Sequence, residues 1–413
     1  MKALVLAGGV PQIELIEQLR ARGITTVLCD YYENPVARKH ADIFYQVSTL
    51  DIPAVTKVAL DEKVDFLITV CTDQALLSVA QISEDLGLPC YLSYETARNV
   101  TNKSYMKNIF AEKNISSARF VVMGQLDMAK IECLQYPLIV KPVDCNSSKG
   151  VKKVTNEAEL TEAFETAIKL SRTDTAIVEE FITGPELSAD VYIENGKAHV
   201  LCISELDKLP FDDKFIIFRG KTPSFMSRKL FAHIEKTAQQ IADAFDLTDS
   251  PMLIQLIARD EKAYVLEFSA RTGGGEKYFL VPKISGFDPI KAVIDLTLGL
   301  KPHVEEERPE ETVFANEFIY CRDGVFDHLE NFEKLKQDGV FTEYCCFHPT
   351  GTVFDKIASS GDRAAGFMLF AKNKNELQSM HEAALAQIKV IDENGEDMMR
   401  RDLLPDVYEQ EAL

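Results

Sequence analysis

Long apolar runs and clusters of basic residues are both missing from this sequence of 413 residues. No stretch reaches the roughly 18 uncharged apolar residues that a membrane-spanning helix requires. The apolar segment at residues 3–10 is too short for a signal peptide and continues directly into Pro11 and Glu14. The formal net charge of −20 leaves no basic face for nucleic acid or an anionic membrane. We therefore expect an acidic, cytoplasmic protein with neither as a partner.

Metal-type cysteine pairs and a clustered catalytic histidine are missing as well. The nine cysteines are odd in number and include no C-x-x-C, and Cys345 and Cys346 are adjacent, which is poor spacing for zinc. The seven histidines are scattered and indicate no catalytic base. The cysteines therefore predict a reducing compartment rather than a zinc site or a disulfide framework.

The length and the apolar content of 46% are sufficient for two or three packed domains. Strands are expected at residues 4–8, 25–30, 65–70 and 89–92, with one helix at residues 12–22 and another that follows residue 70 and ends at residue 86. This alternation predicts a parallel sheet with helices on both faces. Ligand sites in such sheets lie at the C-terminal ends of the strands, here at Gly8–Gly9, Asp30 and residues 71–73.

Beyond residue 102 the pattern is mixed. Helices are expected at residues 103–113, 157–170, 228–245 and 376–388, and a long hairpin at residues 253–270. Short strand-like segments lie at residues 120–123, 138–141, 176–181, 187–193 and 198–205. The whole chain is therefore expected to be an α/β and α+β multidomain protein.

A lysine followed by a loop of small polar residues is the first motif with chemical meaning. In YPLIVKPVDCNSSKGV an apolar strand ends at Lys141, and Ser147, Ser148 and Gly150 follow in the loop. Small residues let backbone N–H groups approach phosphate oxygens, and the lysine supplies positive charge. An ordinary hairpin tip explains the segment equally well. It is not a Walker A loop.

A second motif, VEEFITGPELSADV, joins two strand-like segments through a Gly-Pro turn. Such a connector can present backbone groups to an adenine edge, an apolar side chain to its face and a carboxylate to the ribose. An inter-strand corner with solvated acids is the alternative.

A third motif, LEFSARTGGGEKY, follows the first strand of the long hairpin. Glu267 lies near the end of its strand, and Gln255 is at a plausible opposite position on the partner strand. Oxygen ligands on facing strands suit Mg²⁺, which binds one or two protein oxygens together with phosphates and water. Arg271 precedes three glycines, where it could bind a carboxylate or phosphate with two hydrogen bonds. A purely structural glycine turn is the alternative reading.

The order, spacing and content of these motifs together resemble the ATP-grasp superfamily of carboxylate–amine ligases. Similar patterns occur in D-alanine–D-alanine ligase, biotin carboxylase, carbamoyl phosphate synthetase and bacterial amino-acid ligases. The resemblance implies an ATP-grasp fold with an N-terminal Rossmann-like pre-ATP-grasp domain at residues 1–100. The ATP-grasp domain would span residues 101–310, with a small lobe at about 115–185. A C-terminal segment, residues 311–413, would pack on the large lobe.

The resemblance also implies roles for individual residues. Lys103 and Lys141, with Ser147, Ser148 and Gly150 of the loop, would contact the ATP phosphates. Glu179, Glu180, Phe181 and Ile182 would line the adenine, and Glu186 would bind the ribose. Glu267 would bind metal together with Gln255 and Ser269, and Arg271 and Lys214 would act in catalysis. Many relatives carry an acid where this chain has Gln255 and Asn where it has Ser269, so a second metal is in doubt.

The implied reaction phosphorylates a carboxylate with ATP and transfers the acyl group to an amine. The implied cofactors are ATP and Mg²⁺, with Mn²⁺ as an alternative. A homodimer is one of the oligomeric states that the resemblance leaves open. Two other functions are alternatives. A dinucleotide-dependent dehydrogenase fits Gly8–Gly9 and Asp30, but AGGVPQ lacks the G-x-G-x-x-G fingerprint. A non-catalytic nucleotide sensor would not need both Glu267 and Arg271.

Overall fold

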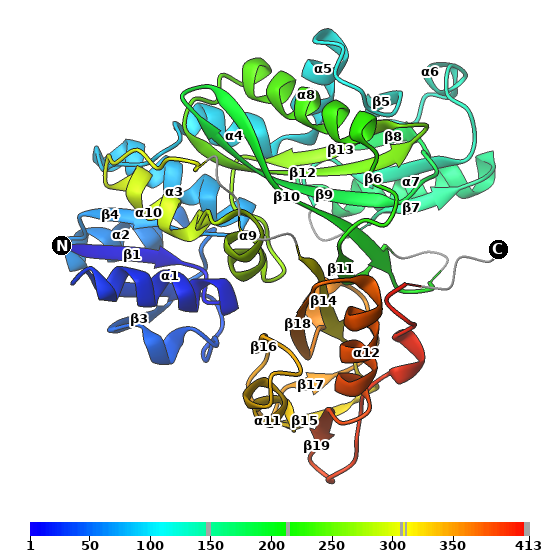
Figure 1. Cartoon of the computed structure of the whole chain (residues 1–413). Helices are drawn as coiled ribbons and strands as arrows, with labels where there is room; N and C mark the ends of the chain where they lie inside the picture. The colour runs from blue at the N-terminus through cyan, green and yellow to red at the C-terminus, as the bar shows by residue number, and fades with distance from the viewer. Residues whose placement is uncertain (146–149, 212–214, 306–308, 310–311, 409–413) are drawn as a thin grey trace.

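The computed structural model describes residues 1–145, 150–211, 215–305, 309 and 312–408. Figure 1 shows an N-terminal domain in blue, a large central sheet with a small lobe beside it, and a C-terminal domain in orange and red. Within the described ranges, no helix combines the length and apolarity needed to cross a bilayer.

The N-terminal domain is built on a four-stranded parallel sheet of order β3-β2-β1-β4. Ala3 and Val5 face one core with helix α1, whereas Leu4 and Leu6 face another core with α2 and α3. The predicted parallel sheet with helices on both faces is therefore confirmed. Its elements are β1 (Lys2–Leu6), α1 (Val10–Ala21), β2 (Thr25–Asp30), β3 (Ile43–Gln46), α2 (Ile52–Glu62), β4 (Phe66–Ile68) and α3 (Asp73–Leu86).

One predicted strand of this domain is wrong. Residues 89–92 form no strand, and the sheet is completed instead by β3, which the sequence analysis missed. The hydroxyl of Tyr91 donates a hydrogen bond to the carbonyl oxygen of Ala270 over 3.1 Å. The segment thus leaves the sheet to contact the second domain, and it continues into α4 (Tyr94–Thr101) and α5 (Lys103–Glu112).

One helix of the N-terminal core comes from far along the chain. Helix α10 (Pro289–Thr297) contributes Ile290, Val293 and Ile294 to the core that α1 and β1 share. Figure 1 shows α10 lying beside the blue strands. The N-terminal core therefore extends beyond the first hundred residues, and the predicted domain bounds remain predictions.

The small lobe is a four-stranded antiparallel sheet of order β5-β8-β6-β7. Helix α7 packs on this sheet through Leu160 and Phe164, which meet Val140 and Val178 in the lobe's core. Its elements are β5 (Phe120–Met123), α6 (Met128–Ile131), β6 (Leu138–Pro142), β7 (Lys152–Val154), α7 (Glu157–Leu170) and β8 (Ala176–Glu180).

An eight-stranded sheet of order β13-β12-β9-β10-β11-β14-β18-β16 forms the centre of the molecule. Helix α8 (Arg228–Ala244) packs on one face of it, and α9 (Lys277–Ser285) packs on the other. The predicted hairpin is present, and Gln255 is the direct partner of Glu267, as expected. The strands are β9 (Glu186–Glu194), β10 (Lys197–Lys208), β11 (Ile217–Lys221), β12 (Ser250–Arg259), β13 (Lys262–Ser269), β14 (Val313–Ile319), β16 (Glu343–Cys346) and β18 (Ala365–Ala371).

The C-terminal domain shares this sheet. Strands β14, β16 and β18 extend it, and a separate three-stranded sheet of order β17-β15-β19 packs below them. The helix expected near residues 376–388 is present as α12. The remaining elements are β15 (Gly324–Glu330), α11 (Phe332–Gln337), β17 (Val353–Phe354), α12 (Lys374–Leu385) and β19 (Lys389–Asp392).

Candidate active site

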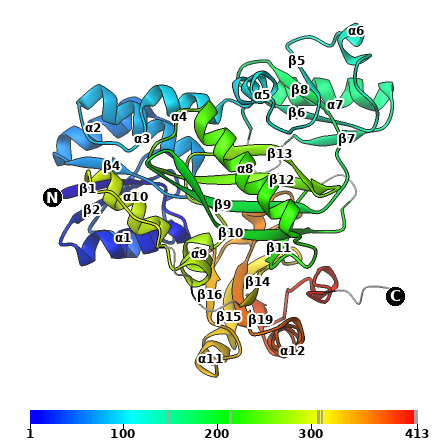
Figure 2. The ribbon, with the colours of Figure 1, turned by 45° about the horizontal axis from the view of Figure 1, so that its top comes forward.

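A cavity lies between the small-lobe sheet and the large sheet, which Figure 2 shows side by side. Most residues predicted to bind the nucleotide line it, although they come from four separate stretches of the chain. The predicted residues lining this first cavity are Lys103, Lys141, Glu179, Glu180, Phe181, Ile182, Glu186, Gln255 and Glu267.

One end of this cavity holds a cluster of buried lysines and acids. Glu179 on β8 accepts from Lys141 Nζ over 2.5 Å and forms an ion pair of 2.8 Å with Lys107. Burial would raise the pKa of Glu179, but the two lysines outweigh it and lower that pKa to about 2. Lys103, at the start of α5, lies 3.2 Å from Glu267 and donates to the Cys145 carbonyl over 2.9 Å. Three lysines therefore share two carboxylates, and the two that line the cavity, Lys103 and Lys141, suit capture of a phosphate chain.

The connector after β8 forms the other end of the cavity. Glu186, the first residue of β9, forms an ion pair with Lys208 of β10, and both side chains line the cavity. The ring of Phe181 lies under Lys153 Nζ, 4.2 Å from its centroid. Glu180 is engaged at the rim by Arg119 through a hydrogen bond of 3.0 Å. Phe181 and Glu186 therefore bring an apolar ring and a carboxylate to the same part of the cavity lining.

Oxygen-bearing side chains face one another across the hairpin. Gln255 pairs with Glu267 on one side and with Ser188 on the other, and the buried Ser188 Oγ has no hydrogen-bond partner among the described residues. In the described ranges, no group of three or more His, Cys, Asp or Glu residues is arranged to hold a metal. Mg²⁺ typically completes its coordination with phosphates and water. This donor set therefore fits a metal that binds together with the nucleotide phosphates.

Arg271 lies beyond Glu267 and is paired with an acid of the N-terminal domain. Its Nε and Nη2 donate to the two carboxylate oxygens of Asp73 over 2.8 and 2.7 Å, and its Nη1 donates to the Thr272 carbonyl. Burial would lower the pKa of Arg271, but Asp73 outweighs it and raises that pKa. One N–H on each of Nη1 and Nη2 is not used in these three hydrogen bonds.

The segment around Asp73 also holds the turn that follows Arg271. The Cys71 backbone N–H donates to Thr272 Oγ1 over 3.0 Å, and the Cys71 thiol donates to the Gly273 carbonyl over 3.0 Å. A Cβ at Gly273 would collide with the side chains of Asp190 and Lys277, so this close approach requires glycine. The N-terminal domain therefore fixes the Arg271 loop directly.

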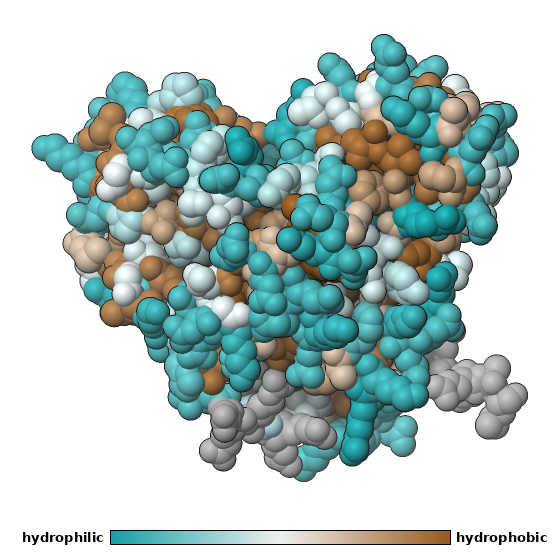
Figure 3. All heavy atoms as spheres, turned by 90° about the horizontal axis from the view of Figure 1, so that it is seen from above, coloured by the Kyte–Doolittle hydropathy of each residue, from teal (hydrophilic) through white to brown (hydrophobic). Residues whose placement is uncertain are grey.

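A second cavity, of about 390 Å³, meets the first at Lys103 and Glu267. It lies between the N-terminal domain and the small lobe, where Figure 3 shows the surface hollowed. Asp73 and Ser269 line its base, while Gln74, Ser78 and Gln81 line one wall from α3. A small molecule in this cavity would lie beside the end of a phosphate chain bound in the first.

The comparison with known families agrees with this geometry. Residues 134–278 match the family described as ATP-grasp domain, a stretch that contains the lysine of β6, the connector and the hairpin. The chain contains an ATP-grasp domain.

Similar proteins extend the ATP-grasp likeness beyond this stretch. D-alanine–D-alanine ligase of Thermosipho africanus is 30% identical over 52% of this chain and 60% of its own length. The L-arginine-specific L-amino acid ligase of Bacillus subtilis is 24% identical over 70% of this chain and 71% of its own length. The L-amino acid ligase structure from Bacillus licheniformis superposes with a TM-score of 0.79, covering 95% of this chain and 99% of that one at 22% identity. The last likeness shows the ATP-grasp fold. The chain spans about half to three fifths of the first curated relatives it matches.

Some residues of the predicted site lie outside the described residues, and three charged residues that pair with predicted ones were missed. Ser147, Ser148 and Lys214 lie outside the described residues, whereas Gly150 is described and has a φ of +75°. Lys107, Asp73 and Lys208 were not assigned roles from the sequence. The spacing of Lys103 and Lys107, one helical turn apart in TNKSYMK, could have indicated the first. Asp73 lies at a strand end that the sequence analysis identified, but its pairing with Arg271 required the tertiary structure.

Proposed function

We propose that this chain is an ATP-dependent ligase that joins a carboxylate to an amine and releases ADP and phosphate. The observation that carries the proposal is the meeting of two cavities at Lys103 and Glu267. The first cavity brings together lysines, an aromatic ring and a carboxylate. The second opens onto the same two residues from the N-terminal side.

The reaction would proceed in two steps, transfer of a phosphoryl group to the carboxylate and then transfer of the acyl group to the amine. A carboxylate oxygen attacks the γ-phosphorus of ATP, so that the bond to the β-phosphate breaks and an acyl phosphate and ADP form. The amine nitrogen then attacks the carbonyl carbon, phosphate leaves with its bonding electron pair, and the surplus proton passes to solvent. Lys103 and Lys141 would hold the phosphates, and Arg271 would hold the acid through its Nη1–Nη2 edge. Mg²⁺, or Mn²⁺ in its place, would be held by Glu267 and Gln255 and would neutralise phosphate charge.

A nucleotide sensor without turnover is the second candidate. One observation favours it: the Nε–Nη2 edge of Arg271 is already occupied by Asp73. Arg271 itself lines neither cavity, but its partner Asp73 lines the second one, and Glu267 lies beside Lys103 at the junction of the two cavities. These features support the ligase as the first candidate.

The test is release of ADP and phosphate from Mg-ATP with paired panels of carboxylates and amines. The ligase predicts release that needs both an acid and an amine, with a new amide in the product. Binding of ADP without turnover for any pair would favour the sensor. A rise in melting temperature with NADH but not with Mg-ADP would contradict both, since bound ligand stabilises the folded state by mass action.

A further inference from the structure

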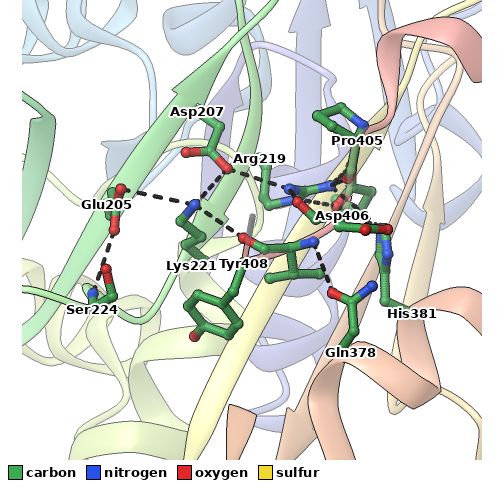
Figure 4. A network of polar contacts seen from close by, with 12 residues as sticks. Glu205, Asp207, Arg219, Lys221, Ser224, Gln378, His381, Pro405, Asp406 and Tyr408 are labelled. Atoms are coloured by element: carbon green, nitrogen blue, oxygen red, sulfur yellow. Dashed lines mark hydrogen bonds and ion pairs between the residues drawn. The ribbon is translucent and has the colours of Figure 1, made fainter. Parts of the chain in front are cut away.

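The C-terminal end of the described chain runs as a strap across the central sheet. Residues 405–408, defined here as the strap, lie against β10, β11 and α12 (Figure 4). Arg219 of β11 donates to the carbonyls of Pro405 and Asp406 over 2.5 and 2.9 Å. Lys221, two residues on, donates to the Val407 carbonyl over 3.0 Å. Two strand cations thus bind three successive backbone carbonyls of the strap.

Arg219 is held rigidly while it binds the strap. Its side chain is fully buried, and Glu317 of β14 accepts from its Nε over 2.6 Å and from its Nη2 over 3.2 Å. Its Nη1 also donates to Asp207 of β10 over 3.3 Å. Because the guanidinium is planar and fixed by two carboxylates, it can bind the strap carbonyls only in one position.

The far end of the strap is anchored from the C-terminal domain. The buried Val407 donates its backbone N–H to Gln378 Oε1 of α12 over 3.0 Å. The ring of Tyr408 lies between two ammonium groups, with its centroid 5.6 Å from Lys221 Nζ and 4.9 Å from Lys374 Nζ. The strap therefore joins α12 to the side chains of β11.

The C-terminal end of β10 and the start of β9 form a wall of the first cavity. Asp207, which accepts from both Arg219 and Lys221, directly precedes Lys208, and the pairing of β10 with β11 is irregular between these two residues. Lys208 and its partner Glu186 line the first cavity on one side. On the other side they line a cavity of about 870 Å³ that Pro405, Asp406 and Tyr408 also bound. The Glu186–Lys208 pair is thus a partition between the nucleotide cavity and the strap.

We propose that the strap positions the Glu186–Lys208 wall and thereby sets the affinity for the nucleoside part of the nucleotide. This inference rests on the proposed function, in which the first cavity binds the nucleotide. Without the strap, Arg219 and Lys221 lose three carbonyl acceptors, and buried donors that lose acceptors seek new ones. Asp207 is the acceptor that both already share, so its strand end shifts and Lys208 moves with it. The lysine cluster at the other end is held by Glu179, Glu267 and the Cys145 carbonyl, which belong to other elements.

The decisive experiment compares the full chain with a variant truncated after Leu404, using calorimetric titration with Mg-ADP and with inorganic tripolyphosphate. We expect the dissociation constant for Mg-ADP to rise about tenfold, the loss expected for one charge-assisted contact. The dissociation constant for tripolyphosphate should stay within about twofold, because that probe needs only the lysine cluster. A synthetic peptide of residues 402–413 added to the truncated protein should restore Mg-ADP affinity.

Point variants separate positioning from simple stabilisation. Gln378→Ala removes the acceptor for the Val407 N–H, whereas Gln378→Glu keeps an acceptor oxygen. Only Gln378→Ala should therefore weaken the binding of Mg-ADP. Unchanged Mg-ADP affinity in the truncated protein would overturn the inference. Equal loss of affinity for Mg-ADP and tripolyphosphate, together with a large fall in melting temperature, would also overturn the inference, because the strap would then only stabilise the fold. If the full chain binds tripolyphosphate but not Mg-ADP, the proposed function itself fails.

Discussion

Two buried networks of cations and carboxylates in this molecule are balanced in opposite ways. At the end of the first cavity, Lys103, Lys107 and Lys141 share the carboxylates of Glu179 and Glu267. Beneath the strap, Arg219 and Lys221 meet three carboxylates and also bind three backbone carbonyls.

The difference indicates which network is prepared for a ligand. A cluster with more cations than acids gains a favourable partner when an anion binds, whereas the strap network already satisfies its donors with protein acceptors. Both clusters are buried and rich in charge, so burial and charge alone would not distinguish a binding site from a structural tie. The number of protein acceptors that surround the buried cations distinguishes the two.

The largest expected effect comes from removing the acid that belongs to the cation-rich network and to the metal set. Glu267→Gln should abolish turnover while Mg-ADP binding and the melting temperature stay close to wild type, because the two side chains have nearly the same volume. Rates of ADP release and parallel melting curves provide the measurement. Wild-type turnover in this variant would remove Glu267 from the metal set.

Arg271→Lys should give the next largest effect. Lysine keeps the charge but cannot bind Asp73 and a substrate oxygen through a planar fork. Single-turnover rates should fall by on the order of 30- to 1,000-fold, equivalent to about 2–4 kcal/mol, with Mg-ADP affinity nearly unchanged. Asp73→Asn is the matched control, because it keeps the shape but weakens the pairing, and it should reduce the rate in the same direction. A wild-type rate for Arg271→Lys would exclude the acid-binding role.

Lys107→Met should affect acid stability more than chemistry. Glu179 has a folded-state pKa of about 2, below its ordinary value of 4.5, so it stabilises the fold above pH 4.5 and loses that contribution as the pH falls toward 2. Removing Lys107 should raise the pKa of Glu179 and move acid unfolding to higher pH. The free energy of unfolding at pH 7 should fall by roughly 3–5 kcal/mol, as for other buried pairs that lose one partner. Urea unfolding between pH 2 and 7 measures the free energy of unfolding and the pH of acid unfolding. An unchanged pH of acid unfolding would contradict the pairing of Glu179 with Lys107.

Gln255→Glu should have the smallest effect and tests the unusual ligand. An added carboxylate opposite Glu267 should lower the Mn²⁺ concentration needed for half-maximal activity by about threefold to tenfold, through the stronger attraction of a second charge. Gln255→Met, which lacks a strong oxygen ligand, is the control and should raise that concentration. Equal metal dependence in all three proteins would exclude Gln255 from the metal set.

Local patterns predicted the elements well, and spacing along the chain predicted the hairpin partners. Helix α7 lies where its apolar period placed it, and Gln255 faces Glu267 as expected. The failures involve contacts between distant segments. Residues 89–92 look like a strand, but Tyr91 contacts Ala270 instead, and Asp73 meets Arg271 across 198 residues. Lys107 received no role from the sequence because helix periodicity alone does not show that Glu179 lies beside it.

The position of α10 has a consequence for how this protein is made. Residues 1–100 leave the ribosome long before α10 is synthesised, yet Ile290, Val293 and Ile294 complete their core. At typical rates of synthesis the interval between residues 100 and 297 is roughly 10 to 40 s. During that interval the apolar residues of α1 and β1 that pack against α10 are exposed to solvent, so the nascent domain is prone to aggregation. We expect chaperone demand to peak during this window, and detaching α10 from the chain should cause aggregation of the N-terminal fragment rather than a clean separation of domains.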